Sequence, residues 1–244
     1  GVHYLRDIAD VDGLQAVFSA GKRIAIVGGG YIGLEVAAVG AKRGLDVTVF
    51  EAMDRLMARA VSVPVSDFYA AEDEKAGVKL LLRTGVEAIE GDGKAASKVK
   101  AVRAGGKTYD ADIVLVGIGV LPNDELATHA GLASQDGIVV DQNGRTGDPS
   151  IFAAGDCTRH IGREGTAIRL ECVQNAIDQA KHCALAIAGK PKVYSEVPWF
   201  WSDQYDLKLQ IAGLARPTDQ TVLRGDPAAR KFAVFHLRDG VMAA

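Results

Sequence analysis

Short apolar runs that end at glycine or at a charged residue recur along the chain. The run Ile24–Val27 is rich in β-branched residues and stops at Gly28, which predicts a buried strand followed by a tight turn. Beyond the turn, apolar residues recur at helical spacing as far as Gly44, a residue that can end a helix in the left-handed conformation. A second apolar run, Val47–Phe50, predicts the next strand. This order predicts a βαβ unit in an α/β fold with a parallel sheet.

Between residues 63 and 119 the pattern changes from helical to β-type. The segment VPVSDFYAAEDEKAG, with Pro64 near its start and Gly77 at its end, predicts a helix. Short β-type runs then begin at residues 78, 86, 98 and 107, and glycine and charge interrupt them, most clearly at GDGKAAS. This pattern predicts a strand-rich excursion attached to the βαβ domain.

The second half of the chain predicts one strand, one helix and an aromatic cluster. The strand is expected at Ile151–Ala154, and the helix from about Val173 to Ala188. The helix is amphipathic and its apolar face is expected to pack inward; that face contains Ile177, Ala180, Ala184 and Ile187. Both tryptophans, Trp199 and Trp201, follow within three residues, and clustered aromatic residues are more often core than cofactor contacts.

Composition narrows the class of protein. The 244 residues are 48% hydrophobic with a formal net charge of −3, which is typical of a globular protein long enough for more than one core. The absence of a long basic run argues against nucleic acid as a partner, and no apolar run approaches the roughly 18 residues that a membrane span needs. No secretory signal is visible, three cysteines are too few for a disulfide framework, and the five histidines form no metal-binding motif. We therefore expect a cytoplasmic protein without a metal site.

Three glycines after the first strand carry the clearest chemical signal. Gly28, Gly30 and Gly33 have G-x-G-x-x-G spacing, which permits a tight turn, close approach of a pyrophosphate and close packing of helix on strand. Glu51 ends the second strand, where a carboxylate accepts ribose hydroxyls and repels a 2′-phosphate. The pattern predicts NAD rather than NADP, although Arg55 is close enough to favour NADP. The alternative is a tight turn without a ligand.

Two later turns are less specific. Gly117, Ile118 and Gly119 follow an apolar strand, and small residues there let a cofactor lie against the backbone; the alternative is an ordinary glycine turn. Asp156 follows Gly155 in IFAAGDC. Its carboxylate is suited to a sugar-like hydroxyl or, equally, to capping a helix.

Five motifs extend these signals over the whole chain: GGGYIGLE, GIGVLPN, IFAAGDC, RLECVQNA and PWFWSDQY. In this order and at these distances they resemble the FAD-dependent NADH:ferredoxin reductase family of bacterial oxygenase systems, of the putidaredoxin reductase and biphenyl dioxygenase reductase type. The resemblance implies an α/β fold with a Rossmann-like NAD-binding domain, part of a two-part FAD domain and an incomplete α+β C-terminal domain. The implied boundaries are 1–21 for a linking segment, 22–145 for the NAD-binding domain, 146–192 for the second FAD segment and 193–244 for the truncated C-terminal reductase domain.

The resemblance also implies site residues. The NAD site would be formed by Gly28, Gly30, Tyr31, Ile32, Gly33, Glu51, Arg59, Gly117, Ile118 and Gly119. Glu35 would reach the nicotinamide carboxamide and so take part in catalysis. On the flavin side, Asp156 would bind the ribityl chain, with Glu171 and Val173 near the isoalloxazine ring. Trp201 would be the aromatic residue beside the flavin.

The implied activity is that of a flavoprotein oxidoreductase that passes electrons from NADH through FAD to a ferredoxin-type iron–sulfur protein. The alternatives are a related reductase that serves rubredoxin, a nitrite reductase system or a quinone, and a nucleotide-binding module without activity in this form. The chain departs from the family pattern because it contains no second G-x-G-x-x-G for FAD. It therefore resembles an internal fragment, which we expect to bind NAD, to hold FAD weakly, and to leave Ile177 and Ile187 exposed.

Overall fold

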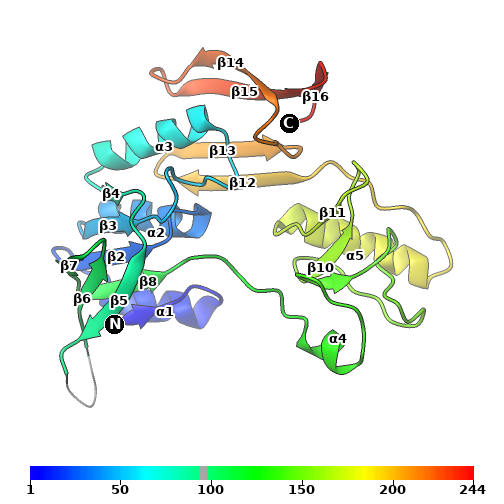
Figure 1. The fold of residues 1–244 in the computed structure, drawn as a ribbon, viewed down its shortest axis with the longest axis horizontal. Coiled ribbons are helices and arrows are strands. Elements are labelled where there is room, and N and C mark those ends of the chain that lie inside the picture. The colour runs from blue at the N-terminus through cyan, green and yellow to red at the C-terminus, as the bar shows by residue number, and fades with distance from the viewer. Residues whose placement is uncertain (94–97) are drawn as a thin grey trace. The chain divides into compact units, whose positions relative to one another are not determined.

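The computed structural model describes residues 1–93 and 98–244 (Figure 1). Part of the turn expected at GDGKAAS therefore lies outside the described residues. The chain divides into two compact units. Unit 1 comprises Gly1–Gly119, Ser202–Leu209 and Ala215–Ala243, and unit 2 comprises Val120–Trp201, Gln210–Leu214 and Ala244.

A five-stranded parallel sheet forms the centre of unit 1, in the order β1-β8-β2-β3-β4 (Figure 1). Its strands are β1 (Val2–His3), β8 (Ile113–Val116), β2 (Arg23–Val27), β3 (Asp46–Phe50) and β4 (Lys79–Leu81). Four of these are the strands expected from the apolar runs, and β1 is an additional edge strand. The predicted α/β class with a parallel sheet is confirmed.

Helix α2 (Tyr31–Lys42) connects β2 to β3 and packs on one face of the sheet. Close packing depends on small residues, because a Cβ at Gly40 would already lie 3.2 Å from Val47 Cγ2. The helix ends at Lys42 with Arg43 as its C-cap, and Gly44 then adopts φ +77°, as its sequence position predicts. Two more helices belong to unit 1: α1 (Ile8–Val17), capped by Asp7, and α3 (Val63–Lys75), which begins with the expected proline.

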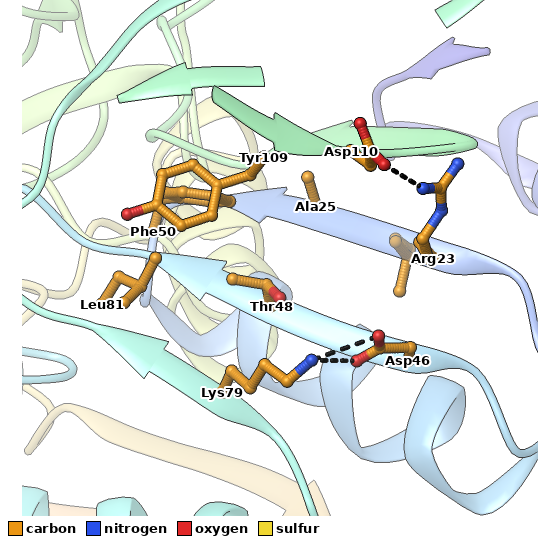
Figure 2. Close-up of a pocket in the computed structure, with 10 residues that line it drawn as sticks. Arg23, Ala25, Asp46, Thr48, Phe50, Lys79, Leu81, Tyr109 and Asp110 are labelled. Atoms are coloured by element: carbon orange, nitrogen blue, oxygen red, sulfur yellow. Dashed lines mark hydrogen bonds and ion pairs between the residues drawn. The ribbon is translucent and has the colours of Figure 1, made fainter. Parts of the chain in front are cut away.

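The opposite face of the sheet packs against an antiparallel meander of β5 (Val86–Gly91), β6 (Val99–Ala104) and β7 (Lys107–Asp110). The buried residues of this layer are Ala25, Phe50, Val102, Ala104, Ala111 and Val114. A cavity of about 280 Å³ lies in this layer, and its lining includes the Phe50 and Tyr109 rings and the ion pairs Arg23–Asp110 and Lys79–Asp46. Figure 2 shows these side chains. The opposed charges at the cavity rim neutralise one another.

The C-terminal region is built from two groups of strands. Strands β12 (Trp199–Gln204) and β13 (Leu207–Ala212) form a two-stranded sheet. Strands β14 (Gln220–Asp226), β15 (Lys231–Arg238) and β16 (Val241–Met242) form the other group. Within unit 1, Phe68 of α3 meets Phe232 of β15 edge-on at 5.0 Å between ring centroids. Helix α3 therefore packs against part of the C-terminal region.

Unit 2 contains α4 (Glu125–His129), the small sheet β11-β10-β9 and α5 (Val173–Ile187). The strands are β9 (Ile138–Val139), β10 (Thr158–Ile161) and β11 (Ala167–Ile168). The expectation of a strand at Ile151–Ala154 was wrong, because only Phe152 pairs, through one bridge to Arg145. The Thr146 hydroxyl donates there to the carbonyls of Asp148 and Ile151, which favours a turn over a ladder.

Helix α5 lies where it was expected in the sequence, but its apolar face points outward rather than inward. Ile177 and Ile187 are 49% and 66% exposed, so the expectation that the apolar face packs inward was wrong. The buried face is mainly polar, and two of its side chains have partners inside unit 2: Asn175 accepts the Tyr194 hydroxyl at 2.8 Å, and Gln179 accepts the Thr158 hydroxyl at 2.9 Å. The exposure expected at Ile177 and Ile187 for a fragment is confirmed.

Two further features concern the described part of the chain as a whole. None of its helices has the length and apolar content to cross a bilayer. Within the same residues, no three His, Cys, Asp or Glu side chains gather as a metal site requires.

Candidate functional site

The carboxyl ends of β2, β3 and β8 meet at a glycine turn. Gly28, at the end of β2, adopts φ +108°, and its N–H donates to the Phe50 carbonyl at 2.8 Å. A Cβ on Gly28 would lie 2.4 Å from the carbonyl oxygen of Gly117, which follows β8. The sheet edge can close only because residue 28 is glycine, so this position is structural as well as a predicted NAD contact.

Gly33 and Gly30 differ in what surrounds them. A Cβ on Gly33 would lie 2.1 Å from the Gly28 carbonyl oxygen, so glycine is needed for α2 to approach the turn. Gly30, the N-cap of α2, has φ −83°, and a Cβ built on it would have no described atom within 4 Å other than those of Gly30 and its two chain neighbours. The space beside Gly30 is open at a helix N-terminus, which fits the approach of a pyrophosphate to the backbone.

Glu51 is fixed by backbone groups on both sides. Its Oε2 accepts the Gly29 N–H at 2.7 Å, and its Oε1 accepts the Met53 N–H at 2.7 Å. Each carboxylate oxygen keeps a lone pair for another donor. The side chain is half-buried at the end of β3, next to the glycine turn, and this arrangement fits a ribose whose hydroxyls donate to the carboxylate.

The loop that follows Glu51 holds two arginines in different ways. Arg55 donates to the carbonyls of Val61 at 2.8 Å and Ala58 at 2.7 Å, so its guanidinium closes the loop on itself. The Met57 N–H donates to the Gly29 carbonyl at 2.9 Å, which ties the same loop to the glycine turn. Arg59 is exposed on this loop. For Arg55 to serve a 2′-phosphate, its remaining N–H groups would have to reach the ribose while two others hold the loop.

Glu35 lies one turn into α2, after Tyr31 and Ile32. The carboxyl is half-buried, and burial raises its pKa above the ordinary value, an effect that the Ser202 hydrogen bond opposes. Ile32 is 40% exposed, and burial also raises the pKa of the Tyr31 phenol. Beyond β8, Ile118 is exposed and Gly119 adopts φ +129°. All residues expected for NAD lie in unit 1, on the elements that meet at the carboxyl edge of its sheet.

The residues expected on the flavin side lie in unit 2. Gly155 adopts φ +87°, and its N–H donates to buried Gln179 at 2.7 Å, which fixes the turn that presents Asp156. Asp156 itself is exposed. Because the turn is held by α5 rather than by the Asp156 carboxylate, that carboxylate is open to a hydroxyl donor, which fits a sugar-like chain.

Arg169 and the tryptophan pair complete this side. Arg169 forms an ion pair with Glu171, and its Nη1 lies 3.5 Å from the Asp156 carbonyl oxygen. Trp199 and Trp201 stack with ring centroids 5.2 Å apart, and Trp201 is 37% exposed, so the pair is not part of a closed core. The Trp199 N–H donates to Gln174 at 3.1 Å, which links the pair to the start of α5, where Val173 is exposed.

Four residues that organise these sites were not predicted from the sequence. Ser202, Gln204, Gln179 and Arg169 act by holding other groups, at Glu35 or at the turn before Asp156. Their motifs were visible in PWFWSDQY and RLECVQNA, but neither periodicity nor spacing indicates which buried polar groups pair across the fold.

Comparison with known proteins places the chain. Residues 1–180 match the model described as pyridine nucleotide-disulphide oxidoreductase, and residues 199–244 match the model described as reductase C-terminal. The chain therefore belongs to the pyridine nucleotide-disulphide oxidoreductase family. The expected resemblance to ferredoxin reductases is confirmed by these matches and by the relatives.

Two curated relatives are similar along the whole chain. The probable ferredoxin reductase CtmF of Castellaniella defragrans is 47% identical over 100% of this chain and 60% of its own length. The 5,5'-dehydrodivanillate O-demethylase ferredoxin reductase subunit of a Sphingobium species is 46% identical with the same coverage. The chain thus spans about 60% of the length of these relatives.

Solved structures agree with this placement. The ferredoxin reductase for the CYP199A2 system of Rhodopseudomonas palustris matches with a TM-score of 0.95 and 40% identity, over 99% of this chain and 59% of that one. The covalent putidaredoxin reductase–putidaredoxin complex matches with a TM-score of 0.94 and 38% identity, over 99% of this chain and 58% of that one.

Proposed function

We propose that this chain is the NAD-binding and acceptor-proximal part of a flavoprotein oxidoreductase, which passes electrons from NADH through FAD to a ferredoxin-type iron–sulfur protein. Its family membership and the ferredoxin reductases among its relatives support the reaction class. The observation that carries the proposal is the fixed Glu51 carboxylate beside the open space at Gly30. These two features suit the two ends of an adenosine diphosphate group.

The residues of unit 1 bind and orient the coenzyme in this proposal. Glu51 accepts the adenosine ribose hydroxyls, Arg59 lies toward the adenosine end, and the N–H groups at the start of α2 face the pyrophosphate. Tyr31, Ile32 and Gly117–Gly119 line the path toward the nicotinamide. Glu35 holds the carboxamide, which fixes the ring by placement rather than by proton transfer.

The residues of unit 2 contribute to the flavin site in this proposal. Asp156 accepts from the ribityl chain, and Glu171 and Val173 border the ring, with Trp201 beside it. When bound, FAD supplies the conversion between two-electron transfer from NADH and one-electron transfer to an iron–sulfur centre. The proposal includes an NAD-binding domain at 22–145, a second FAD segment at 146–192 and a C-terminal reductase domain at 193–244. It also includes a cytoplasmic location.

An anaerobic stopped-flow experiment on the full-length flavoprotein that contains this chain tests the proposal. NADH should bleach the flavin absorbance, and a [2Fe–2S] ferredoxin added in a second mix should restore it. If a rubredoxin or a quinone restores the flavin absorbance and a ferredoxin does not, the acceptor in the proposal is wrong. A flavin that NADH does not reduce would contradict the oxidoreductase function and leave a nucleotide-binding module.

A further inference from the structure

We propose that Ser202, itself held by Gln204, is a positioning residue that orients the Glu35 carboxylate toward the nicotinamide end of the coenzyme. This inference rests on the proposed function, because it needs Glu35 at the coenzyme. It assigns a role to strand β12 of the C-terminal region in setting up the NAD site of unit 1.

The contacts form a directed chain of hydrogen bonds. Gln204 Nε2 donates to Ser202 Oγ at 3.2 Å, and Ser202 Oγ donates to Glu35 Oε1 at 2.6 Å. A serine hydroxyl has a single proton and can turn freely. The donor from Gln204 occupies its lone-pair side, so the proton is directed at Glu35, and neighbouring bonds in such a chain strengthen one another.

Strand geometry explains why these two residues act together. Side chains two positions apart on a strand point to the same face, and Ser202 and Gln204 are 1% and 0% exposed. Trp201 and Asp203, which alternate with them, are exposed. Strand β12 therefore presents a buried polar pair on one face, and Glu35 of α2 is the charged group that this pair meets.

Because Glu35 is half-buried, the Ser202 hydrogen bond affects both the orientation and the pKa of its carboxyl. Burial and the charge of Asp203 both raise the pKa of the Glu35 carboxyl, whereas the Ser202 bond lowers it. Tyr31 also interacts electrostatically with Glu35, and burial raises the pKa of its phenol. Without Ser202, the ionised carboxylate would lose a donor in a half-buried setting, and both its orientation and its charge state would change.

The test measures the reductive half-reaction of the full-length flavoprotein by stopped flow, over a range of NADH concentrations and pH. We expect Ser202→Ala to lower the limiting rate of flavin reduction about tenfold, as loss of a hydrogen bond to a charged group predicts, with a smaller change in the apparent Kd for NADH. The acidic limb of the pH profile should move to higher pH. Ser202→Thr, which keeps the hydroxyl, should restore the rate and the profile.

A double-mutant cycle separates positioning from a general loss of structure. In a Glu35→Ala background, Ser202→Ala should lower the rate by less than twofold, because there is no carboxylate left to orient. Ser202→Cys, which keeps the volume but donates weakly, serves if the alanine variant does not fold, and its rate should lie between those of wild type and Glu35→Ala.

The outcomes distinguish this inference from the proposed function. Full additivity of the two substitutions, or a serine variant with wild-type rate and pH profile, would overturn the positioning role. A Glu35→Ala variant with the wild-type rate would overturn it as well, while flavin reduction by NADH would still support the oxidoreductase. Absence of flavin reduction in the wild-type protein would instead contradict the proposed function.

Discussion

Glu51 Oε2 accepts the backbone N–H of Gly29 at 2.7 Å, and this bond joins the end of β3 to the turn that opens α2. The two parts of the predicted NAD motif are thus one hydrogen-bonded unit. In the proposed site the bond also holds a negative charge beside the adenosine ribose, so we expect coenzyme selectivity to depend on Glu51.

We expect the protein to bind NADH at least about tenfold more tightly than NADPH, since a 2′-phosphate would face the fixed Glu51 carboxylate. Glu51→Ala should remove most of this discrimination by weakening NADH. Arg55→Met is the matched control: because the Arg55 guanidinium donates to the loop carbonyls of Val61 and Ala58, its loss should weaken both coenzymes by a similar factor. Calorimetric titration gives all the constants, and equal affinities of the wild type for both coenzymes would refute the selectivity.

Asp73 of α3 predicts a pH dependence of stability. Burial raises the pKa of this carboxyl from 3.8 to about 6, although Tyr205 donates to it at 2.6 Å. The folded state therefore holds a proton that the unfolded state releases, so this contribution to stability is complete below pH 3.8 and is lost as the pH rises to about 6. The loss amounts to roughly 3 kcal/mol in the free energy of unfolding.

Urea unfolding of the chain between pH 4 and pH 7.5 measures this effect. The difference in free energy of unfolding between wild type and Asp73→Asn should grow in favour of the variant as the pH rises. Tyr205→Phe removes the donor that opposes the shift, so its decline with pH should extend to higher pH than that of the wild type. A wild type and an Asp73→Asn variant with parallel pH profiles would show that Asp73 is ionised at no cost.

We expect a substitution of Trp201 to affect mainly one half-reaction, the reoxidation by the iron–sulfur partner. Its ring stacks on Trp199 and remains partly exposed, which suits a residue between the flavin and an acceptor surface. In the full-length protein, Trp201→Ala should slow reoxidation by the iron–sulfur partner more than it slows reduction by NADH, and Trp201→Phe should have a smaller effect. Stopped-flow traces in which both half-reactions slow by the same factor would count against this role.

The 244-residue chain produced by itself should bind NADH but hold FAD weakly or not at all. Asp156, Glu171 and Val173 are suited to the ribityl and ring parts, whereas the chain has one G-x-G-x-x-G and we assign it to NAD. The pyrophosphate contacts of FAD are worth several kcal/mol. Each loss of about 1.4 kcal/mol weakens FAD binding tenfold. Absorbance after dialysis checks this, and one FAD retained per chain would contradict it. Sedimentation should also show self-association through the exposed Ile177 and Ile187.

The sequence predicted the parts of the fold that depend on local patterns. The βαβ unit, the glycine turn and the limits of α5 follow from apolar spacing and glycine positions, which act over a few residues. The buried face of α5 does not follow from local spacing. Asn175 and Gln179 are buried because they bond to partners distant in the chain, Tyr194 and Thr158. Periodicity counts apolar residues and gives no weight to satisfied polar ones.

The candidate site shows the same division. Glu51 and the glycines belong to one local motif, so their proximity could be predicted. Ser202 meets Glu35 across 167 positions of sequence, and only the packing of β12 and α2 brings the two together. The strand expected at Ile151–Ala154 failed for a related reason, since side-chain hydrogen bonds in the turn replaced a ladder.

The central claim, that NADH binds at the glycine edge of unit 1, is tested most directly by Gly30→Ala. Apart from its chain neighbours, a Cβ at Gly30 would meet no described atom within 4 Å, and φ is −83°, so alanine fits the folded protein. The methyl group would, however, stand where the pyrophosphate approaches the backbone. Gly13→Ala in α1, which is equally free of contacts, is the control and should leave NADH binding unchanged.

Titration of the chain with NADH, followed by coenzyme fluorescence, gives the decisive comparison. The account predicts that Gly30→Ala lowers the affinity about tenfold or more while the Tm stays within a degree or so of the wild type, as expected for a steric effect on the ligand alone. Wild-type affinity in the Gly30→Ala variant would show that NADH does not bind at this edge.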